Sequence, residues 1–265
     1  MSAVMAGRVF EFETGALTHP GRVRSRNEDS LACVPASGLW VVADGMGGHM
    51  AGDFASQAIS GAIATVGIPS SAPDLEARFM DRLGAAHDAI RRRAAEMGGT
   101  TIGATVVALM IFGSDYAVVW SGDSRCYRLR DGVLDQLTTD HTEVQALIAR
   151  GALSPEEAAR WPRRNVITRA IGVFETPETE IVTGKAFEGD AYLLCSDGLT
   201  EHVEAHEIGA ALAGADPQAA CEALVALTLD RGARDNVSVV VVRLEQPATI
   251  PGVGAGAVRR HPYAV

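Results

Sequence analysis

The stretch Val41–Asp53, VVADGMGGHMAGD, passes from an apolar run through an aspartate into a cluster of glycines. This pattern predicts a β-strand that ends just before Asp44-Gly45 and is followed, near Ala51, by a helix. Asp-Gly is an ordinary turn sequence, but a carboxylate beside bare backbone also suits a metal or phosphate site. The stretch by itself leaves both interpretations open.

Segments on either side predict the remaining elements. Val-rich apolar runs predict strands near 31–35, 39–43, 104–112, 116–121, 125–130, 190–195 and 237–244, with a hairpin over 129–137 turning at Asp131-Gly132. Ala-rich amphipathic segments predict helices over 51–66, 75–96, 204–213 and 216–231. Because helices come before and after a block of strands, we expect an α+β fold or layered sandwich rather than a doubly wound parallel sheet.

Composition limits the class of protein. The chain has 265 residues, of which 47% are hydrophobic and 21% charged, as in a globular protein. A net charge of -10 without a long basic run argues against nucleic acid as a partner. No run approaches the roughly 20 apolar residues of a membrane helix, and the first residues lack a secretion signal. With no CxxC spacing among four cysteines, we expect reduced thiols and a cytoplasmic protein without membrane contact.

The domain organisation is predicted to be simple. We expect one domain over residues 1–245. Within it, segment 141–172 is less regular, carries Pro155 and Pro162, and is predicted to form a flap over a site. Residues 246–265 are rich in Gly and Pro, which is typical of a disordered tail.

Carboxylates recur where the predicted strands begin or end. Each of them alone is explained by turn or cap chemistry. Together they would meet at one rim of a sheet, where they repel one another unless a cation compensates. Oxygen ligands without a Cys or His pattern favour Mg²⁺ or Mn²⁺. The residues concerned are Glu28, Asp29, Asp44, Asp123, Asp197 and Asp235.

Eight motifs are spread over roughly residues 15–244. They are RVRSRNEDS, VVADGMGGHMAG, GTTIGATVVAL, SGDSRCYRLRDG, LTTDHT, PRRNVITRAIG, LLCSDGLTEHV and RDNVSVVVV. These motifs, in this order, resemble those of the bacterial metal-dependent Ser/Thr protein phosphatases of the PPM (type 2C) family. The resemblance implies a four-layer α-β-β-α sandwich, in which two antiparallel sheets pack face to face with helix pairs outside.

The resemblance also implies a metal site with Mn²⁺ or Mg²⁺, two ions in its core. Asp44 would bridge the two ions, and the Gly45 carbonyl would bind the second. Asp197 and Asp235 would complete the shell of the first ion. Asp123 and Asp197 resemble the ligands of a third, weaker ion in bacterial members.

Further residues around the ions receive roles from the same resemblance. Glu28 would reach the second ion through water, and Asp29 would hydrogen-bond metal-bound waters. Arg24 occupies the position of the phosphate-binding arginine, and its planar fork suits a phosphoryl group. Many eukaryotic members have a general-acid His directly after the Asp-Gly pair; here that position is Met46, while His49 belongs to a bacterial variant of the motif.

Two cations a few Å apart lower the pKa of a bridging water, and the resulting hydroxide can attack phosphorus in line. The predicted activity is therefore hydrolysis of phosphoserine and phosphothreonine in proteins, by a monomer that opposes a bacterial Ser/Thr kinase and acts on its targets. A short form without sensor domain or anchor also resembles phosphatases that work beside type VI secretion kinases. The alternatives are a phosphoprotein-binding pseudophosphatase, which would be expected to lack one of Asp44, Asp197 and Asp235, and a phosphohydrolase of small phosphoesters. In the flap, Trp161 stands where many bacterial relatives have His.

Overall fold

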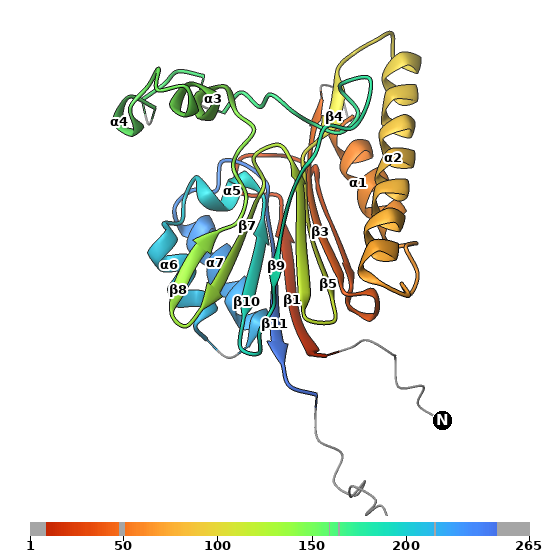
Figure 1. Cartoon of the computed structure of the whole chain (residues 1–265). Helices are drawn as coiled ribbons and strands as arrows, with labels where there is room; N and C mark the ends of the chain where they lie inside the picture. The colour runs from red at the N-terminus through yellow and green to blue at the C-terminus, as the bar shows by residue number, and fades with distance from the viewer. Residues whose placement is uncertain (1–8, 48–50, 159, 164, 215, 248–265) are drawn as a thin grey trace, which may run out of the picture.

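Two antiparallel sheets form the centre of the molecule (Figure 1). The computed structural model describes residues 9–47, 51–158, 160–163, 165–214 and 216–247. The first sheet has the order β1 (Glu11–His19), β11 (Val237–Glu245), β10 (Ala191–Cys195), β7 (Arg125–Arg130) and β8 (Val133–Gln136). The second has the order β2 (Asp29–Val34), β3 (Leu39–Gly47), β5 (Val106–Phe112), β6 (Asp115–Ser121) and β9 (Glu180–Lys185), and β4 (Ile102–Ala104) pairs with β3.

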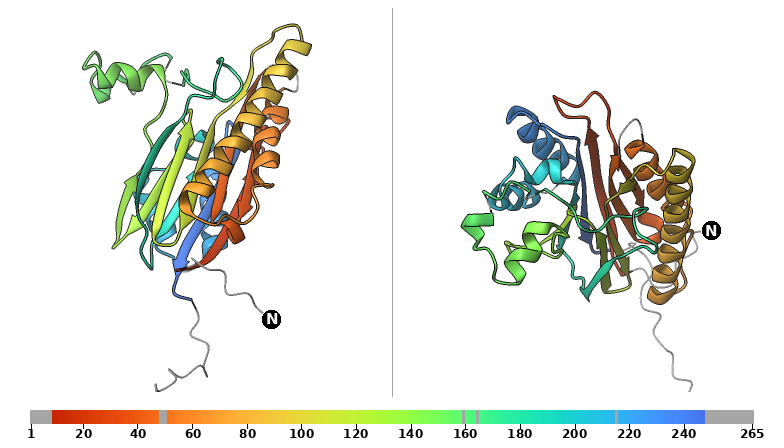
Figure 2. Two further views of the ribbon diagram at one scale, coloured as in Figure 1. Left: turned by 45° about the vertical axis from the view of Figure 1, so that its right-hand side comes forward. Right: turned by 90° about the horizontal axis from the view of Figure 1, so that it is seen from above.

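Helices cover the outer faces of both sheets (Figure 2). On the second sheet lie α1 (Gly52–Ile63) and α2 (Ala72–Glu96), and a short 3₁₀ helix, Pro35–Ser37, joins β2 to β3. On the first sheet lie α6 (Ala205–Leu212) and α7 (Pro217–Asp230), beside the short α5 (Asp197–Thr200). The predicted α+β fold, a four-layer α-β-β-α sandwich, is therefore confirmed.

Both faces of the central strands are buried, which explains why they read as continuous apolar runs instead of alternating ones. In β5, Val107 and Leu109 pack between the two sheets, whereas Val106 and Ala108 pack against α1 and α2. The inter-sheet layer also holds the fully buried Trp40, whose Nε1–H donates to Thr14 Oγ1 across the sandwich at 3.1 Å. The sheets are thereby fixed face to face.

The structure departs from the predicted elements in several strands, and the run predicted over 104–112 is divided into β4 and β5. β1 and β9 were not predicted, because each is partly exposed and mixes polar with apolar residues. β3 does not end at residue 43 but continues to Gly47, since β4 supplies backbone partners to Gly45, Met46 and Gly47. The prediction that the strand ends before Asp44-Gly45 is therefore wrong: both residues lie within β3.

The flap predicted at 141–172 leaves one end of the sandwich and carries α3 (Glu143–Ala149) and α4 (Pro155–Ala158) (Figure 1). Of the predicted tail, residues 248–265 lie outside the described residues, as does His49. Within the part of the chain that the structure describes, no helix is long and apolar enough to cross a membrane.

Candidate metal centre

A cavity of about 300 Å³ opens at the end of the sandwich from which the flap leaves. Carboxylates from both sheets line it, because their strands end or begin at this rim. All but one of the predicted site residues contribute to its wall: Arg24, Glu28, Asp44, Gly45, Asp123, Asp197 and Asp235. The exception, Asp29, is buried and pairs with Asp44 in the register of β2 and β3. The structure thus brings the whole predicted set together.

Hydrogen bonds fix the two paired aspartates. The Asp44 N–H donates to Thr105 Oγ1 at 3.2 Å, and the Thr105 N–H donates to the Asp44 carbonyl at 2.8 Å. The Ser196 hydroxyl donates to Asp29 Oδ2 at 2.8 Å and accepts the Ser238 N–H at 3.0 Å. Because Ser196 and Ser238 belong to the first sheet and Asp29 to the second, this chain of bonds joins the sheets beneath the cavity.

Two glycines let the backbone and Glu28 approach closely. A Cβ on Gly45 would lie 2.0 Å from the Gly52 carbonyl oxygen and 2.6 Å from that of Glu28. A Cβ on Gly52 would lie 2.9 Å from both Glu28 Oε1 and the Gly45 carbonyl oxygen. Real Cβ atoms do not pack so tightly, so both positions require glycine. The Gly45 carbonyl and the Glu28 carboxylate therefore lie side by side.

Asn236 is a structural residue of this site that the sequence did not reveal. Its Nδ2 donates to the carbonyls of Pro20 at 3.0 Å and Arg26 at 2.8 Å, and its Oδ1 accepts the Glu28 N–H at 2.8 Å. It thus holds the loop that carries Arg24 and Glu28 against the start of β11. The Asp-Asn pair before β11 was the available signal, but only its aspartate suggested chemistry.

The carboxylates disturb one another's protonation. Burial raises the pKa of Asp44 well above its usual range, and the carboxylates of Asp29, Asp197 and Asp123 raise it further. Burial, followed by the charge of Asp123, likewise raises the pKa of Asp197 well above normal. Burial raises the pKa of Asp29 and of Asp123 to about 6 each. Each shift reflects first the cost of burying a charged carboxylate and then the repulsion of its neighbours.

Elsewhere the protein pairs its buried carboxylates with arginine. Asp190, 1% exposed, accepts two hydrogen bonds from Arg130, at 2.7 and 2.6 Å. In contrast, no described Lys or Arg forms an ion pair with Asp44, Asp123 or Asp197. Asp29 Oδ1 is buried without any hydrogen-bond partner.

This donor set fits hard divalent cations, which take carboxylate and carbonyl oxygens. The shell is not closed as it stands: among the described residues, no three Asp, Glu, His or Cys side chains converge on one point. Asp235 is held by Arg24, whose Nη2 lies 2.6 Å from Asp235 Oδ2.

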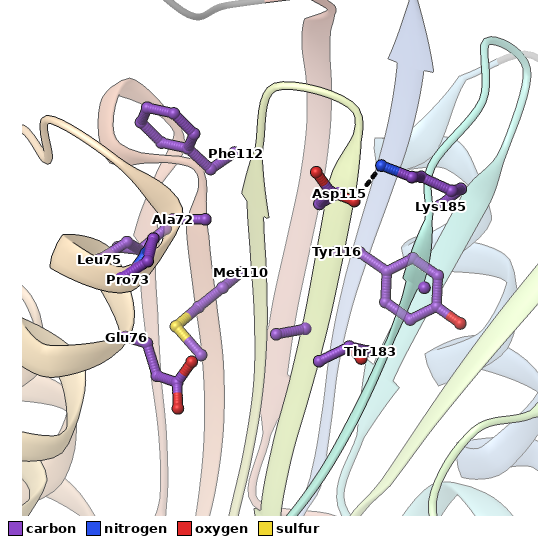
Figure 3. Close-up of a pocket in the computed structure, with 12 residues that line it drawn as sticks. Ala72, Pro73, Leu75, Glu76, Met110, Phe112, Asp115, Tyr116, Thr183 and Lys185 are labelled. Atoms are coloured by element: carbon purple, nitrogen blue, oxygen red, sulfur yellow. Dashed lines mark hydrogen bonds and ion pairs between the residues drawn. The ribbon is translucent and has the colours of Figure 1, made fainter.

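A second, larger hollow lies far from these carboxylates. This apolar groove of about 340 Å³ runs between the start of α2 and the strands β5, β6 and β9 (Figure 3). Met110, Phe112 and Leu75 line it, and the Asp115–Lys185 ion pair stands at its edge. It gathers no set of carboxylates, so we place the candidate site at the acidic cavity, where the predicted ligands meet.

Comparison with known families agrees with the site. The family profile described as protein phosphatase 2C matches residues 21–228. The chain belongs to the protein phosphatase 2C family. The match spans every predicted ligand except Asp235, which lies just beyond its end.

Similar proteins place the chain among bacterial members of the protein phosphatase 2C family. The serine/threonine protein phosphatase PstP of Mycobacterium tuberculosis is 40% identical over 222 residues, which cover 83% of this chain but 43% of PstP. The chain thus spans less than half the length of this relative. The structure of PppA, described as a key regulatory component of T6SS in Pseudomonas aeruginosa, has a TM-score of 0.82, with 39% identity over 88% of this chain and 97% of that one. The PstP catalytic domain in complex with two manganese ions has a TM-score of 0.80, with 36% identity over 89% of this chain and 99% of that one.

Proposed function

We propose that this chain is a metal-dependent Ser/Thr protein phosphatase that hydrolyses phosphoserine and phosphothreonine in proteins. The observation that carries the proposal is the cavity in which the predicted carboxylates of both sheets meet, with Arg24 on its wall. Among the described residues, Asp44, Asp123 and Asp197 have no ion-pair partner there, and Asp235 pairs with Arg24. Membership of the protein phosphatase 2C family and the names of the relatives support the same activity.

Asp44, Asp197, Asp235 and the Gly45 carbonyl would hold two Mn²⁺ or Mg²⁺ ions, as the two manganese ions in the PstP catalytic domain suggest. The Glu28 carboxylate packs against Gly52 beside the Gly45 carbonyl, and from there it would bind the second ion through water. When bound, the ions would activate water for attack on phosphorus and offset charge on the phosphoryl oxygens. Asp123 would help to hold a third ion.

The chain's own residues would orient the substrate. The Arg24 side chain is 54% exposed, so its guanidinium is accessible to a phosphoryl group. Since the same guanidinium contacts Asp235, the two would separate as Asp235 takes a cation and Arg24 takes the phosphate. Asp29 Oδ1 is buried beside Asp44 without a hydrogen-bond partner and would accept a hydrogen bond from a water bound there. Met46 lines the cavity where many eukaryotic relatives have His, and its thioether supplies no proton.

The substrates would be phosphoproteins made by a bacterial Ser/Thr kinase. The similarity to PppA favours a kinase that belongs to a type VI secretion system. The net charge of -10 favours a protein over a nucleic acid as the phosphorylated partner.

Phosphate release from a phosphothreonine peptide tests the proposal, measured with Mn²⁺, with Mg²⁺ and with EDTA. We expect turnover with either metal, none with EDTA, and loss of turnover in Asp197→Asn. Absence of turnover in folded, metal-loaded protein would refute the phosphatase activity. Turnover of p-nitrophenyl phosphate without turnover of the peptide would indicate a small-phosphoester substrate instead.

A further inference from the structure

The flap is attached to the sandwich through its two ends. Thr142 and Ile167 form an isolated β-bridge, and the Glu143 N–H donates to the Val166 carbonyl at 2.9 Å. The Thr168 N–H donates to the His141 carbonyl at 2.7 Å. These bonds close the base of the flap. Beyond them, α3 and α4 project away from the sheets (Figures 1 and 2).

One side-chain hydrogen bond connects the flap beyond its base to the body of the protein. Asn165 Nδ2 donates to Glu201 Oε1 at 2.7 Å. Among the described flap residues between 143 and 166, no other side chain makes a hydrogen bond or ion pair to the sandwich; Arg163, for example, pairs within the flap with Glu143 at 3.0 Å. Among these described residues, the Asn165–Glu201 bond is therefore the one polar side-chain contact that ties the flap beyond its base to the body.

This hydrogen bond lies where two hollows meet. Asn165 lines the acidic cavity and also a neighbouring cavity of about 370 Å³ beneath α3 and α4. Asp123 and Asp197 line both hollows too. Glu201 directly follows α5, and its N–H donates to the Asp197 carbonyl at 2.9 Å. The flap is thus tied to the short helix that begins with a predicted metal ligand.

We propose that the Asn165–Glu201 hydrogen bond is a latch that positions the flap beside the acidic cavity, so that Asn165 and Glu201 help to bind phosphoprotein substrates. The proposal rests on the proposed function for its substrate. A phosphorylated protein is long enough to contact the flap on either side of its phosphoresidue, whereas a small phosphoester fits within the acidic cavity. The latch therefore acts on protein substrates more than on small ones.

The latch residues are exposed and joined by one bond, so the latched state is favoured only modestly over the open one. A hydrogen bond to a charged group that is partly screened by water changes the equilibrium constant between the latched and the open state by a factor of about ten. Loss of the bond should therefore weaken the positioning of the flap, and with it the binding of a protein substrate, by a factor of this size.

Exchange of donor and acceptor tests the latch. Asn165→Asp places two carboxylates face to face and breaks it, whereas Asn165→Asp with Glu201→Gln restores a bond of the same length, donated from the other side. We expect Asn165→Asp to raise KM for a phosphothreonine peptide about three- to tenfold more than KM for p-nitrophenyl phosphate. The double variant should return this ratio to within about twofold of the parent chain.

Arg163→Gln is the matched control, because it lowers the charge of the flap by one unit, as Asn165→Asp does, but leaves the latch intact. Its ratio of KM values should remain that of the parent chain. The latch is refuted if Asn165→Asp changes KM equally for both substrates. It is also refuted if the change in the double variant equals the sum of the changes in Asn165→Asp and in Glu201→Gln measured alone.

Hydrogen–deuterium exchange of the flap keeps this test independent of activity. Amides of residues 143–166 should exchange faster in Asn165→Asp and return to the parent rate in the double variant. Unchanged exchange in Asn165→Asp would contradict the latch even in an active enzyme. A parent chain that hydrolyses neither substrate, but shows the expected exchange pattern, would refute the proposed function and leave the latch standing.

Discussion

Asp190 and the aspartates of the acidic cavity are withdrawn from water in opposite ways. At the far end of β10, Asp190 accepts two hydrogen bonds from Arg130, one from the Phe187 N–H and one from the Tyr192 hydroxyl. In the acidic cavity, Asp44, Asp123 and Asp197 have no cationic partner among the described residues. Asp190 completes its interactions within the chain, and the aspartates of the acidic cavity do not. The difference indicates that the cavity is built for cations from outside the chain.

Substituting Asn for an aspartate of the cavity, or for Asp190, should give the largest effects on activity and stability, and the effects should be opposite. We expect Asp44→Asn to lower metal-dependent phosphate release by more than about 100-fold, because a ligand charge is lost. In the metal-free protein the same change should raise the free energy of unfolding by about 1–3 kcal/mol, because it removes a buried, repelled carboxylate. Chemical denaturation and phosphate release measure the two effects.

Asp190→Asn is the control and should behave in the opposite way. It leaves Arg130 without its charged partner and should lower the free energy of unfolding by about 3 kcal/mol, while the activity of the folded fraction stays close to that of the parent chain. If both substitutions destabilise the metal-free protein, Asp190 and the aspartates of the acidic cavity are alike and the contrast fails.

Gly45→Ala should test how tightly the backbone packs around Gly45 at the wall of the cavity. Its Cβ would lie 2.0 Å from the Gly52 carbonyl oxygen, so the backbone beside Glu28 must move. We expect a loss of about 3 kcal/mol in the free energy of unfolding and a marked loss of Mn²⁺ affinity. Gly61→Ala in α1 meets no atom within 4 Å and should raise stability by up to about 1 kcal/mol. Thermal unfolding with and without Mn²⁺ compares the two; equal effects would contradict the packing described for Gly45.

The acidic cavity should also make stability depend on pH. The pKa of both Asp29 and Asp123 is raised to about 6 in the folded chain, against about 3.9 when unfolded. Their protonated forms favour folding below the unfolded value, and this contribution is lost as the pH rises through about 6. The Tm of the metal-free protein should therefore fall by roughly 5–10 °C between pH 5 and pH 8.

Saturating Mn²⁺ should remove or reverse this trend, because protons then compete with the metal for the same oxygens. Scanning calorimetry across the pH range gives both curves. A metal-free Tm that rises steadily from pH 5 to pH 8 would contradict the raised pKa values.

The smallest effect is expected for a substitution in the apolar groove. Its volume is similar to that of the acidic cavity, but it holds no carboxylate cluster. Glu76→Gln removes an exposed charge at its edge and should change the free energy of unfolding by less than about 0.5 kcal/mol. Phosphate release should stay within about twofold of that of the parent chain. A large loss of activity would show that the groove belongs to the functional site.

Patterns local to the chain were sufficient to predict an α+β or layered fold, and the ordered motifs supplied the four-layer sandwich and the candidate ligands through the resemblance to a family. Apolar runs indicate buried strands, and the motifs name Asp44, Asp197 and Asp235. Strands β1 and β9 were missed since they are partly exposed, and the length of β3 depends on β4, which lies more than 50 residues later. The role of Asn236 was also hidden, because its partners Pro20 and Arg26 are distant in sequence. Contacts between distant segments, such as Asn165 with Glu201, need the folded chain.

Calorimetric titration of Mn²⁺ into the parent chain and into Asp44→Asn is the most direct test of the central claim, that unpaired carboxylates in the cavity bind cations. The account predicts at least two ions bound per parent chain, with proton release below about pH 7, and loss of most of this binding in Asp44→Asn. Equal binding by both chains, or no binding by a folded parent chain, would contradict it.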